Sequence, residues 1–491
     1  MTESVMRRAQ WSRWASVALV VLAAALAVVA YQQPLLAAAG VAAILLFILA
    51  YRWPSFVFSA MMLALPFHVM VQRLLRSQLH LSAAAVDIFS LWKEAVIGVL
   101  LLTLFLRTAV GDRRVRLQLR RADMWLAPLV AVAGAYVLVA PMLTIGVFGF
   151  RNYFEPILIF YLVRLIPFNR RQLRWLLTAM IVVAVLVALF GIYQARFFSF
   201  ADLRTFGYLD ASGQLPNAMK TSLTDRNPRP RAASTFTGPN ELGVYLTLFI
   251  LLALNRFPRA TSLRRWLYSG AMGICAGCLF LTLSRSALVA LAVGLFTLVV
   301  LILRDHGTVV VLGRIWGNKR LLVGGVIGLI LVVAAAFAAG VPRRVARTFN
   351  LEDPSAAGHI RSLQQSAAFV GQQPMGIGIG MVGPRAKRFG TQVKTEHSES
   401  TYLQIAMEIG LLGVFLVIAY LVAVVVALER IRRRLPEESD IRAVSQTAVA
   451  FWVGGLAAFT FLPLFQNLVL ASYMWFLAGI SFKADRLVEE Q

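Results

Sequence analysis

The chain has 491 residues, of which 59% are hydrophobic and only 14% are charged, and its formal net charge is +25. So apolar a composition is typical of an integral membrane protein and excludes an ordinary soluble domain. The positive charge does not indicate a nucleic-acid partner. Most of the arginines lie in short segments between apolar runs, where basic residues set the orientation of membrane helices.

Apolar runs long enough to cross a bilayer as helices of about 20 residues recur along the chain. They predict an all-α polytopic membrane protein with about 12–14 transmembrane helices, forming a single integral membrane domain over 1–491. The candidate spans are 14–31, 35–51, 55–71, 87–106, 124–143, 150–166, 174–195, 239–254, 266–282, 286–303, 321–340, 400–428, 443–463 and 467–482. The span at 87–106 is the weakest, because Asp87, Lys93 and Glu94 lie in its first half.

The distribution of Lys and Arg predicts that both termini face the cytoplasm. If the spans alternate from a cytoplasmic N-terminus, short basic segments such as 107–121 and 430–442 fall inside, whereas the turn at 31–34 has no Lys or Arg and falls outside. Two long segments then face outward. They are an external loop at 196–238 and a main external loop at 341–399.

Neither a cofactor nor a metal ion is expected. Cys275 and Cys278 lie inside an apolar span without further ligands, which favours two small core residues over a redox or metal site. Histidines and carboxylates are few and show no ligand spacing. The chain also has no Walker loop, so we do not expect ATP to drive the protein directly.

Four arginines lie at or near the outward ends of predicted spans. A single arginine there usually anchors the helix at the membrane surface. Four on one side favour a binding site, because the planar guanidinium binds phosphate oxygens bidentately and stays charged. They are Arg151, Arg231, Arg285 and Arg361. A pyrophosphate attached to a lipid would lie at this depth.

The main external loop carries a predicted helix and a glycine run. Apolar residues at helical spacing predict a short helix over 358–372, lying on the outer membrane face. Glycines then alternate over 374–380. The run has two interpretations: a flexible turn, or a backbone segment that approaches a substrate closely.

The end of this loop supplies candidate acid–base groups. His397 lies just before the twelfth span and is flanked by Glu396 and Glu399. A neutral imidazole can accept a proton from a sugar hydroxyl while a carboxylate orients it; the alternative is a surface or packing histidine. Glu408 lies about two turns into the span and should face the protein interior. It either pairs with an arginine or satisfies a buried polar group.

Several stretches together resemble the bacterial O-antigen ligase and O-antigen polymerase family. The resemblance covers roughly 120–430. The stretches are Arg151-x-x-x-Glu155-Pro, Arg231-x-x-Ser-x-Phe-x-Gly-Pro-Asn240-Glu-Leu-Gly, Ser284-Arg285-Ser286, Arg361…Pro374-x-Gly-x-Gly-x-Gly380, and His397-Ser…Tyr402-Leu403-Gln-x-x-x-Glu408-x-Gly410-Leu-Leu-Gly413.

The resemblance implies a metal-independent glycosyltransferase in the bacterial inner membrane. It would move a glycan from an undecaprenyl-pyrophosphate donor to a hydroxyl of a glycan or glycolipid acceptor on the outer face. Carried over by position, the four arginines would hold the pyrophosphate, with Glu155, Asn240 and Glu408 in support. In the family pattern, a histidine lies about four residues before the leucine that corresponds to Leu403. Here Glu399 stands at that place and His397 is two residues earlier, so either can be the catalytic group.

The sequence is compatible with three functions. Surplus cations between 343 and 394 favour a polymerase, whose two substrates are both anionic lipids. A ligase would instead join the glycan to lipid A-core or another acceptor. A transporter or flippase of lipid-linked sugars should show discontinuous helices or charges near the membrane midplane. The predicted charges gather at one face, which favours an enzyme.

Overall fold

The computed structural model describes residues 34–112, 115, 117–209, 213–221, 228–306, 354–383, 398–437, 439–465, 467–484 and 487. Within these ranges the regular structure is helical, apart from one isolated antiparallel bridge between Lys220 and Pro230. The prediction of an all-α polytopic membrane protein is therefore confirmed. The predicted spans 14–31 and 321–340 lie outside the described residues.

The helices follow the predicted spans closely. They are α2 (Pro34–Arg52), α3 (Pro54–Ala64), η1 (Leu65–Phe67), α4 (His68–Ser77), α5 (Ala83–Ser90), α6 (Trp92–Ala109), η2 (Arg121–Trp125), α7 (Leu126–Val139), α8 (Leu143–Leu165), α9 (Arg170–Phe197), α10 (Phe200–Thr205), η3 (Asn217–Met219), α11 (Pro239–Arg256), η4 (Phe257–Arg259), α12 (Ser262–Thr282), α13 (Arg285–His306), α17 (Pro354–Gln372), α19 (Thr401–Arg434), α20 (Asp440–Phe459) and α21 (Leu468–Phe482).

Six helical stretches in the described part are long and apolar enough to cross a membrane. They are Pro54–Ser77, Ala83–Ala109, Arg121–Val139, Arg170–Phe197, Arg285–Asp305 and Thr401–Arg434, and Ala38–Arg52 and Leu468–Phe482 are shorter apolar helices. The weakest predicted span, 87–106, is interrupted at Leu91, where α5 gives way to α6. The total of 12–14 spans stays a prediction.

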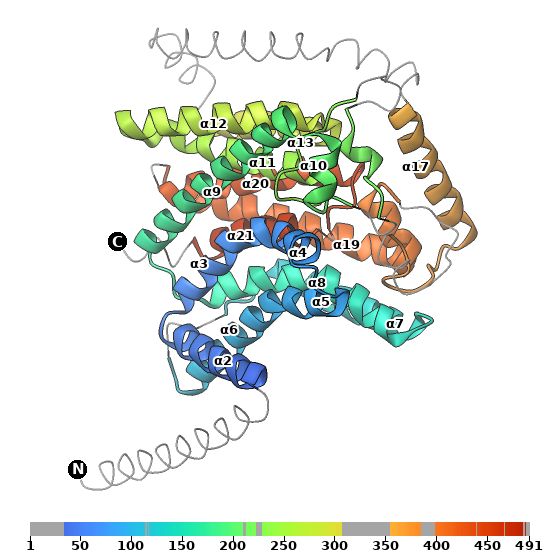
Figure 1. Cartoon of the computed structure of the whole chain (residues 1–491). Helices are drawn as coiled ribbons and strands as arrows, with labels where there is room; N and C mark the ends of the chain where they lie inside the picture. Colours follow the sequence, from blue (N-terminus) through green and yellow to red (C-terminus); the bar gives the residue numbers. More distant parts are fainter. Residues whose placement is uncertain are drawn as a thin grey trace, which may run out of the picture.

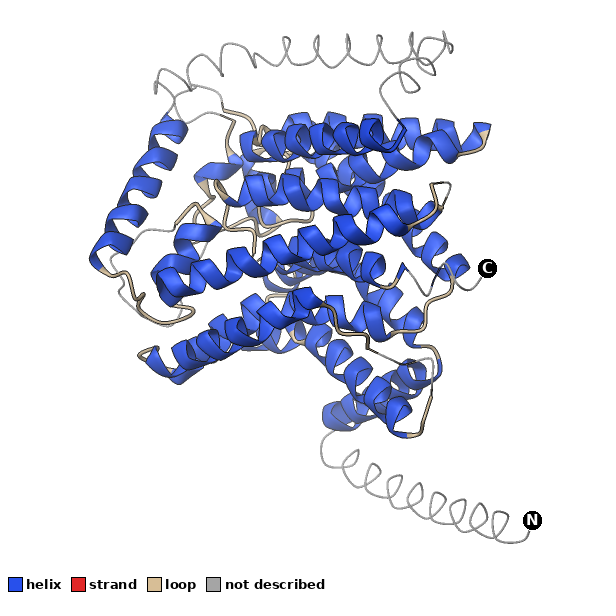
Figure 2. Ribbon diagram, turned by 180° about the vertical axis from the view of Figure 1, so that it is seen from behind, coloured by secondary structure: helices blue, strands red, loops and turns tan. Residues whose placement is uncertain are grey.

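Most of the long helices, including α8, α12 and α19, run in roughly the same direction (Figure 1). In the core, α13 packs against α20, α11 against α12, and α21 against α8. The helix α17 instead crosses the ends of the bundle, which is also clear from behind (Figure 2). The predicted helix at 358–372 is thus present, and it has the transverse direction of a helix that lies along a membrane face.

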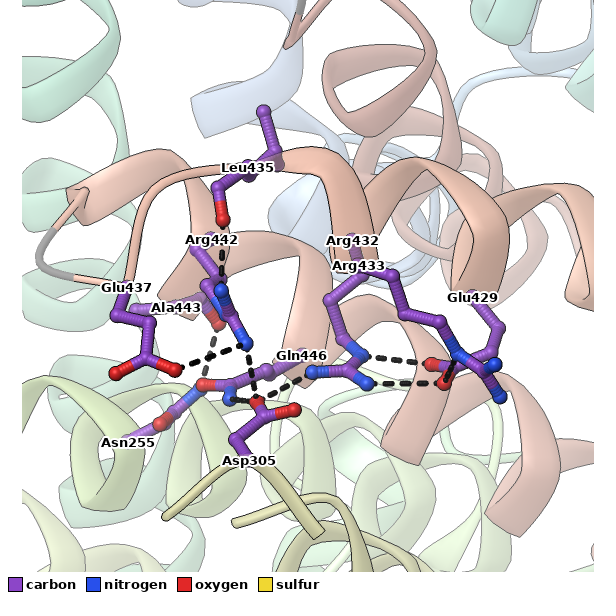
Figure 3. Close-up of polar contacts among 10 residues, drawn as sticks. All are labelled: Asn255, Asp305, Glu429, Arg432, Arg433, Leu435, Glu437, Arg442, Ala443 and Gln446. Atoms are coloured by element: carbon purple, nitrogen blue, oxygen red, sulfur yellow. Dashed lines mark hydrogen bonds and ion pairs between the residues drawn. The ribbon is translucent and has the colours of Figure 1, made fainter.

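At one end of the bundle, buried ion pairs join segments that the charge distribution assigns to the inside. Asp305, at the end of α13, accepts a hydrogen bond from Arg432 of α19 (Figure 3). Its Oδ2 atom also lies 3.0 Å from a guanidinium nitrogen of Arg442 and 2.9 Å from Nε2 of Gln446, both on α20. Arg432 is fully buried and binds Glu429 at 2.6 Å as well. This network fixes the ends of three helices to one another.

A second group of contacts at this end involves the other predicted inside segments. Arg164, at the end of α8, binds Asp123 at 2.7 Å. Arg120 donates to the Phe482 carbonyl, and Lys483 donates to the Ile166 carbonyl. Segments predicted to lie outside meet at the opposite end of the bundle, as described below. The contacts therefore divide the segments into two sets, as alternation of the spans requires. Which set faces the cytoplasm remains a prediction.

Reporter fusions test that orientation. Fusions after Arg121, Arg265 and Arg434 should report a cytoplasmic location, because these segments carry the excess of basic residues. Fusions within 210–225 and 350–395 should report an external location. A cytoplasmic signal from 350–395 would contradict an outward-facing site.

Candidate functional site

Arg231 connects the loop 196–238 to the end of α12. Its Nε donates to the Thr282 carbonyl at 2.7 Å, and its other two nitrogens reach the Ala218 carbonyl at 2.8 Å and the Asn240 side-chain oxygen at 3.3 Å. Asn240 lies in the first turn of α11, which begins at Pro239, where the predicted span 239–254 begins and where a proline is well tolerated. Two predicted site residues are thus in direct contact.

Arg285 begins α13 next to that contact. The chain turns sharply at Leu283, which has a left-handed φ of 51°. The Ser284 hydroxyl then accepts a hydrogen bond from the Ala287 backbone N–H at 3.3 Å, as a capping residue does. The Arg285 side chain is exposed, whereas Ser284 and Ser286 are buried. A cation is therefore presented at a helix N-terminus, where the backbone dipole also favours an anion.

Arg73 of α4 joins this group, although the sequence analysis missed it. Its guanidinium donates to the Phe236 carbonyl at 2.7 Å and to the Thr237 carbonyl at 2.9 Å, and it lies 4.0 Å from the centre of the Tyr208 ring. A signal was present in the sequence. Arg73 follows a predicted span on the side where short turns have no basic residues.

A second group lies between α6 and α8. Arg151 of α8 binds Glu94 of α6 at 3.0 Å and lies 3.4 Å from Glu155, one turn further along α8. Lys93 of α6 contacts Glu94 and lies 3.4 Å from Glu155. Arg151 and Glu155, both named as candidate site residues from the sequence, are therefore in contact. In the sequence, Lys93 and Glu94 are recognisable only as charged residues that weaken the span 87–106.

Glu408 is fully buried in α19 and faces the protein interior as predicted. It accepts hydrogen bonds from the Tyr153 hydroxyl of α8 at 2.7 Å and from the Val382 backbone N–H at 3.1 Å. Gln404, one turn earlier, donates to the Val382 carbonyl at 3.3 Å. Of the two interpretations offered for Glu408, the structure favours the satisfaction of buried polar groups over an arginine pair.

The glycine run 374–380 inserts into a break in α19. The helix is interrupted at Ile409 and at Gly410, which has φ 70° and ψ −178°. The Ile377 and Gly378 N–H groups donate to the Met407 and Glu408 carbonyls at 2.9 and 3.0 Å. In return the Leu411 N–H donates to the Pro374 carbonyl at 2.9 Å. The run therefore replaces hydrogen bonds that the broken helix lacks.

Glycine is required here because backbone meets backbone. A Cβ atom on Gly149 of α8 would lie 2.5 Å from the Gly380 Cα, and one on Gly378 would lie 2.8 Å from the Ala140 Cα. Neither interpretation from the sequence describes this packing. The run is not a free turn, and the partner that it approaches so closely is the protein's own backbone.

The chain that directly follows the candidate acid–base groups is anchored by two hydrogen bonds. Thr401 at the start of α19 donates to the Leu462 carbonyl at 2.7 Å, and Ser400 donates to the Phe459 carbonyl at 3.4 Å. Glu399 pairs with His359 of α17, a residue that the sequence analysis missed. Arg361 lies two residues further along α17 and is exposed. His397 lies outside the described residues.

The predicted site residues thus form three neighbouring groups, linked by helices. Arg231, Asn240 and the turn before Arg285 are the first and Arg151 and Glu155 the second; the third is Glu399 with its partner His359, on the helix that also carries Arg361. Helix α4 links the first two, because it carries both Arg73 and His68, whose Nδ1 accepts a hydrogen bond from Trp92 at 3.0 Å. Helices α8 and α19 link the second and third through the bond between Tyr153 and Glu408.

Metal ligands do not cluster in the part of the chain that the structure describes. No group of three or more His, Cys, Asp or Glu side chains there could hold a metal ion. The metal independence implied by the family resemblance remains a prediction.

Residues 270–418 match a family model described as O-antigen ligase. No curated protein matches the sequence. The matched segment includes Arg285, Arg361, the glycine run, Glu399 and Glu408, whereas Arg151, Arg231 and Asn240 precede it. The match confirms the resemblance seen in the motifs. With the apolar helices, it supports a multi-pass membrane protein that is similar to the O-antigen ligase family over residues 270–418.

Proposed function

We propose that this protein of the O-antigen ligase and polymerase family transfers a glycan from undecaprenyl pyrophosphate to a sugar hydroxyl, and that it acts as a polymerase. The observation that carries the proposal is the junction of α11, α12 and α13. There Arg231 holds Asn240 and the Thr282 carbonyl while Arg285 projects from a helix N-terminus. Such a junction suits the pyrophosphate of a lipid-linked donor.

In this proposal the acceptor hydroxyl attacks the anomeric carbon of the donor. The new C–O bond forms as the bond to the pyrophosphate oxygen breaks, and the hydroxyl proton passes to His397 or Glu399. Negative charge grows on the leaving pyrophosphate, so preorganised cations lower the barrier. Arg285 and Arg361 are exposed and would contact the pyrophosphate. Arg231, which is bound to two backbone carbonyls, would hold the junction in place.

Substitution of Arg285 tests the pyrophosphate site. Arg285→Ala should slow transfer roughly ten- to a hundredfold, because a lost charge-assisted contact costs on the order of 1.5–3 kcal/mol. Arg285→Lys should restore only part of the rate, because an ammonium cannot bind bidentately. The control is Arg264→Ala, which removes an exposed arginine near the opposite end of α12. Transfer at the normal rate by Arg285→Ala would move the pyrophosphate site elsewhere.

Reconstitution separates polymerase from ligase. The cations between 343 and 394 exceed what one pyrophosphate needs, which favours two anionic lipid substrates. The purified protein should therefore extend a single lipid-linked repeat unit into a ladder of longer lipid-linked chains. If it is inactive with that substrate alone and becomes active when lipid A-core or another acceptor is added, the protein is a ligase.

A transporter of lipid-linked sugars is the alternative from another class. One of its expected features, a discontinuous helix, occurs in α19. In transporters, however, the backbone groups freed by the break bind substrate or ions. Here the freed backbone groups of Met407, Glu408 and Leu411 form hydrogen bonds with the backbone of residues 374–378. This difference favours the enzyme.

A further inference from the structure

The cluster of Lys93, Glu94, Arg151 and Glu155 is an alternating arrangement of two cations and two carboxylates. Each carboxylate contacts both cations: Arg151 lies 3.0 Å from Glu94 and 3.4 Å from Glu155, and Lys93 contacts Glu94 and lies 3.4 Å from Glu155. Its formal charge is therefore zero. The neighbouring His68 adds none, because its Nδ1 accepts the Trp92 hydrogen bond and is thus unprotonated.

The cluster is buried at one side and open at the other. The side chains of Lys93 and Glu155 are each 5% exposed, that of Glu94 is 21% exposed and that of Arg151 is 34% exposed. Arg151 is therefore the member that a ligand can reach. The buried atom Glu94 Oε2 has no hydrogen-bond partner among the described residues, so the cluster's polar groups are not all used internally.

Arg151 alone could not present positive charge here. Two carboxylates hold it, and together the three side chains carry a net charge of −1, which would repel an anion. Lys93 cancels that excess from the buried side. Charges in such a poorly solvated place are weakly screened. One uncompensated carboxylate should therefore weaken the binding of an anion at Arg151.

We propose that Lys93 is a positioning residue that balances Glu94 and Glu155, so that Arg151 remains available to the pyrophosphate of the lipid-linked donor. The inference rests on the proposed function, because that function supplies the anionic ligand. It assigns a role to Lys93, which lies outside the matched family segment and does not itself reach the ligand.

Three variants isolate the charge from the packing. Lys93→Met keeps an unbranched chain and leaves a net charge of −1, Glu155→Gln leaves +1, and the double variant is neutral again. Two quantities are measured in nanodiscs for each purified protein: the KM for the lipid-linked donor, and the concentration of undecaprenyl pyrophosphate that gives half-maximal thermal stabilisation. The second measurement requires no turnover.

We expect Lys93→Met to raise both concentrations roughly tenfold, as for one lost charge-assisted contact, with kcat changed less than about twofold. The double variant should return both close to the original values, although it lacks the ion pair. If Lys93→Met does not fold, Glu155→Gln is the test instead. Its net charge of +1 should lower the half-saturating concentration of undecaprenyl pyrophosphate.

Unchanged half-saturation in Lys93→Met, or a double variant no better than Lys93→Met, would overturn the inference and leave the proposed function standing. The same holds if undecaprenyl pyrophosphate does not stabilise the unsubstituted protein. The protein could also show no transfer activity while undecaprenyl pyrophosphate stabilises Lys93→Met more weakly than the unsubstituted protein and the double variant. That result would support the inference and count against the proposed glycosyltransferase.

Discussion

Asp305→Ala should lower the free energy of unfolding by about 3–5 kcal/mol, the usual effect of removing one partner from a buried ion pair. Asp305 is the carboxylate shared by Arg432, Arg442 and Gln446 (Figure 3). Arg432 keeps Glu429, but among the described residues Arg442 would retain Glu437, 3.9 Å away and largely exposed, and the Leu435 carbonyl. A buried guanidinium would thus lose its principal counter-charge.

The fraction folded in an SDS titration of mixed micelles measures this effect. Glu437→Ala is the matched control, because Glu437 is 56% exposed and lies at the edge of the same network. It should change stability by about 0–1 kcal/mol, as partly exposed pairs do. Equal effects of Asp305→Ala and Glu437→Ala would mean that the network contributes little to holding α13, α19 and α20 together.

Local rules were enough to predict much of the fold. Pro239 and Asn240 begin a helix, as the predicted span 239–254 requires, because proline suits the first turn. The amphipathic spacing of 358–372 gave α17. Each of these features depends on residues close to one another in the chain, so the sequence order contains the necessary information.

The site depended on contacts between distant segments, which the sequence order does not contain. The pairing of Glu408 with Tyr153 joins residues 255 positions apart, and Arg73 reaches Phe236 across 163 positions. From the sequence alone Lys93 is only a polar interruption of a span, because its carboxylate partner Glu155 belongs to another helix. A charged residue in a predicted span is therefore better treated as half of an unknown pair than as a fault in the span.

Gly149→Ala and Gly380→Ala should each destabilise the protein and abolish most transfer. A Cβ on Gly149 would lie 2.5 Å from the Gly380 backbone, and one on Gly380 would lie 2.6 Å from the Ile145 carbonyl oxygen, with a φ of 83° that alanine rarely adopts. Overpacking costs about 1–3 kcal/mol, and a left-handed alanine costs about 1–2 kcal/mol more. We therefore expect the larger loss for Gly380→Ala.

The effect on transfer follows from what the glycine run supports. If α8 and the run move apart, the hydrogen bonds to the Met407 and Glu408 carbonyls and the bond from Val382 to the Glu408 side chain are strained. The start of α19, next to Glu399, would shift with them.

Gly134→Ala is the control, because a Cβ there meets nothing within 4 Å in the adjacent helix α7. It should leave transfer unchanged and stabilise the helix slightly, by about 0.5–1 kcal/mol. SDS titration and donor-dependent transfer, measured on the same preparations, provide the two readouts. Normal activity and stability in Gly380→Ala would contradict the close backbone packing and restore the flexible turn as the better interpretation of 374–380.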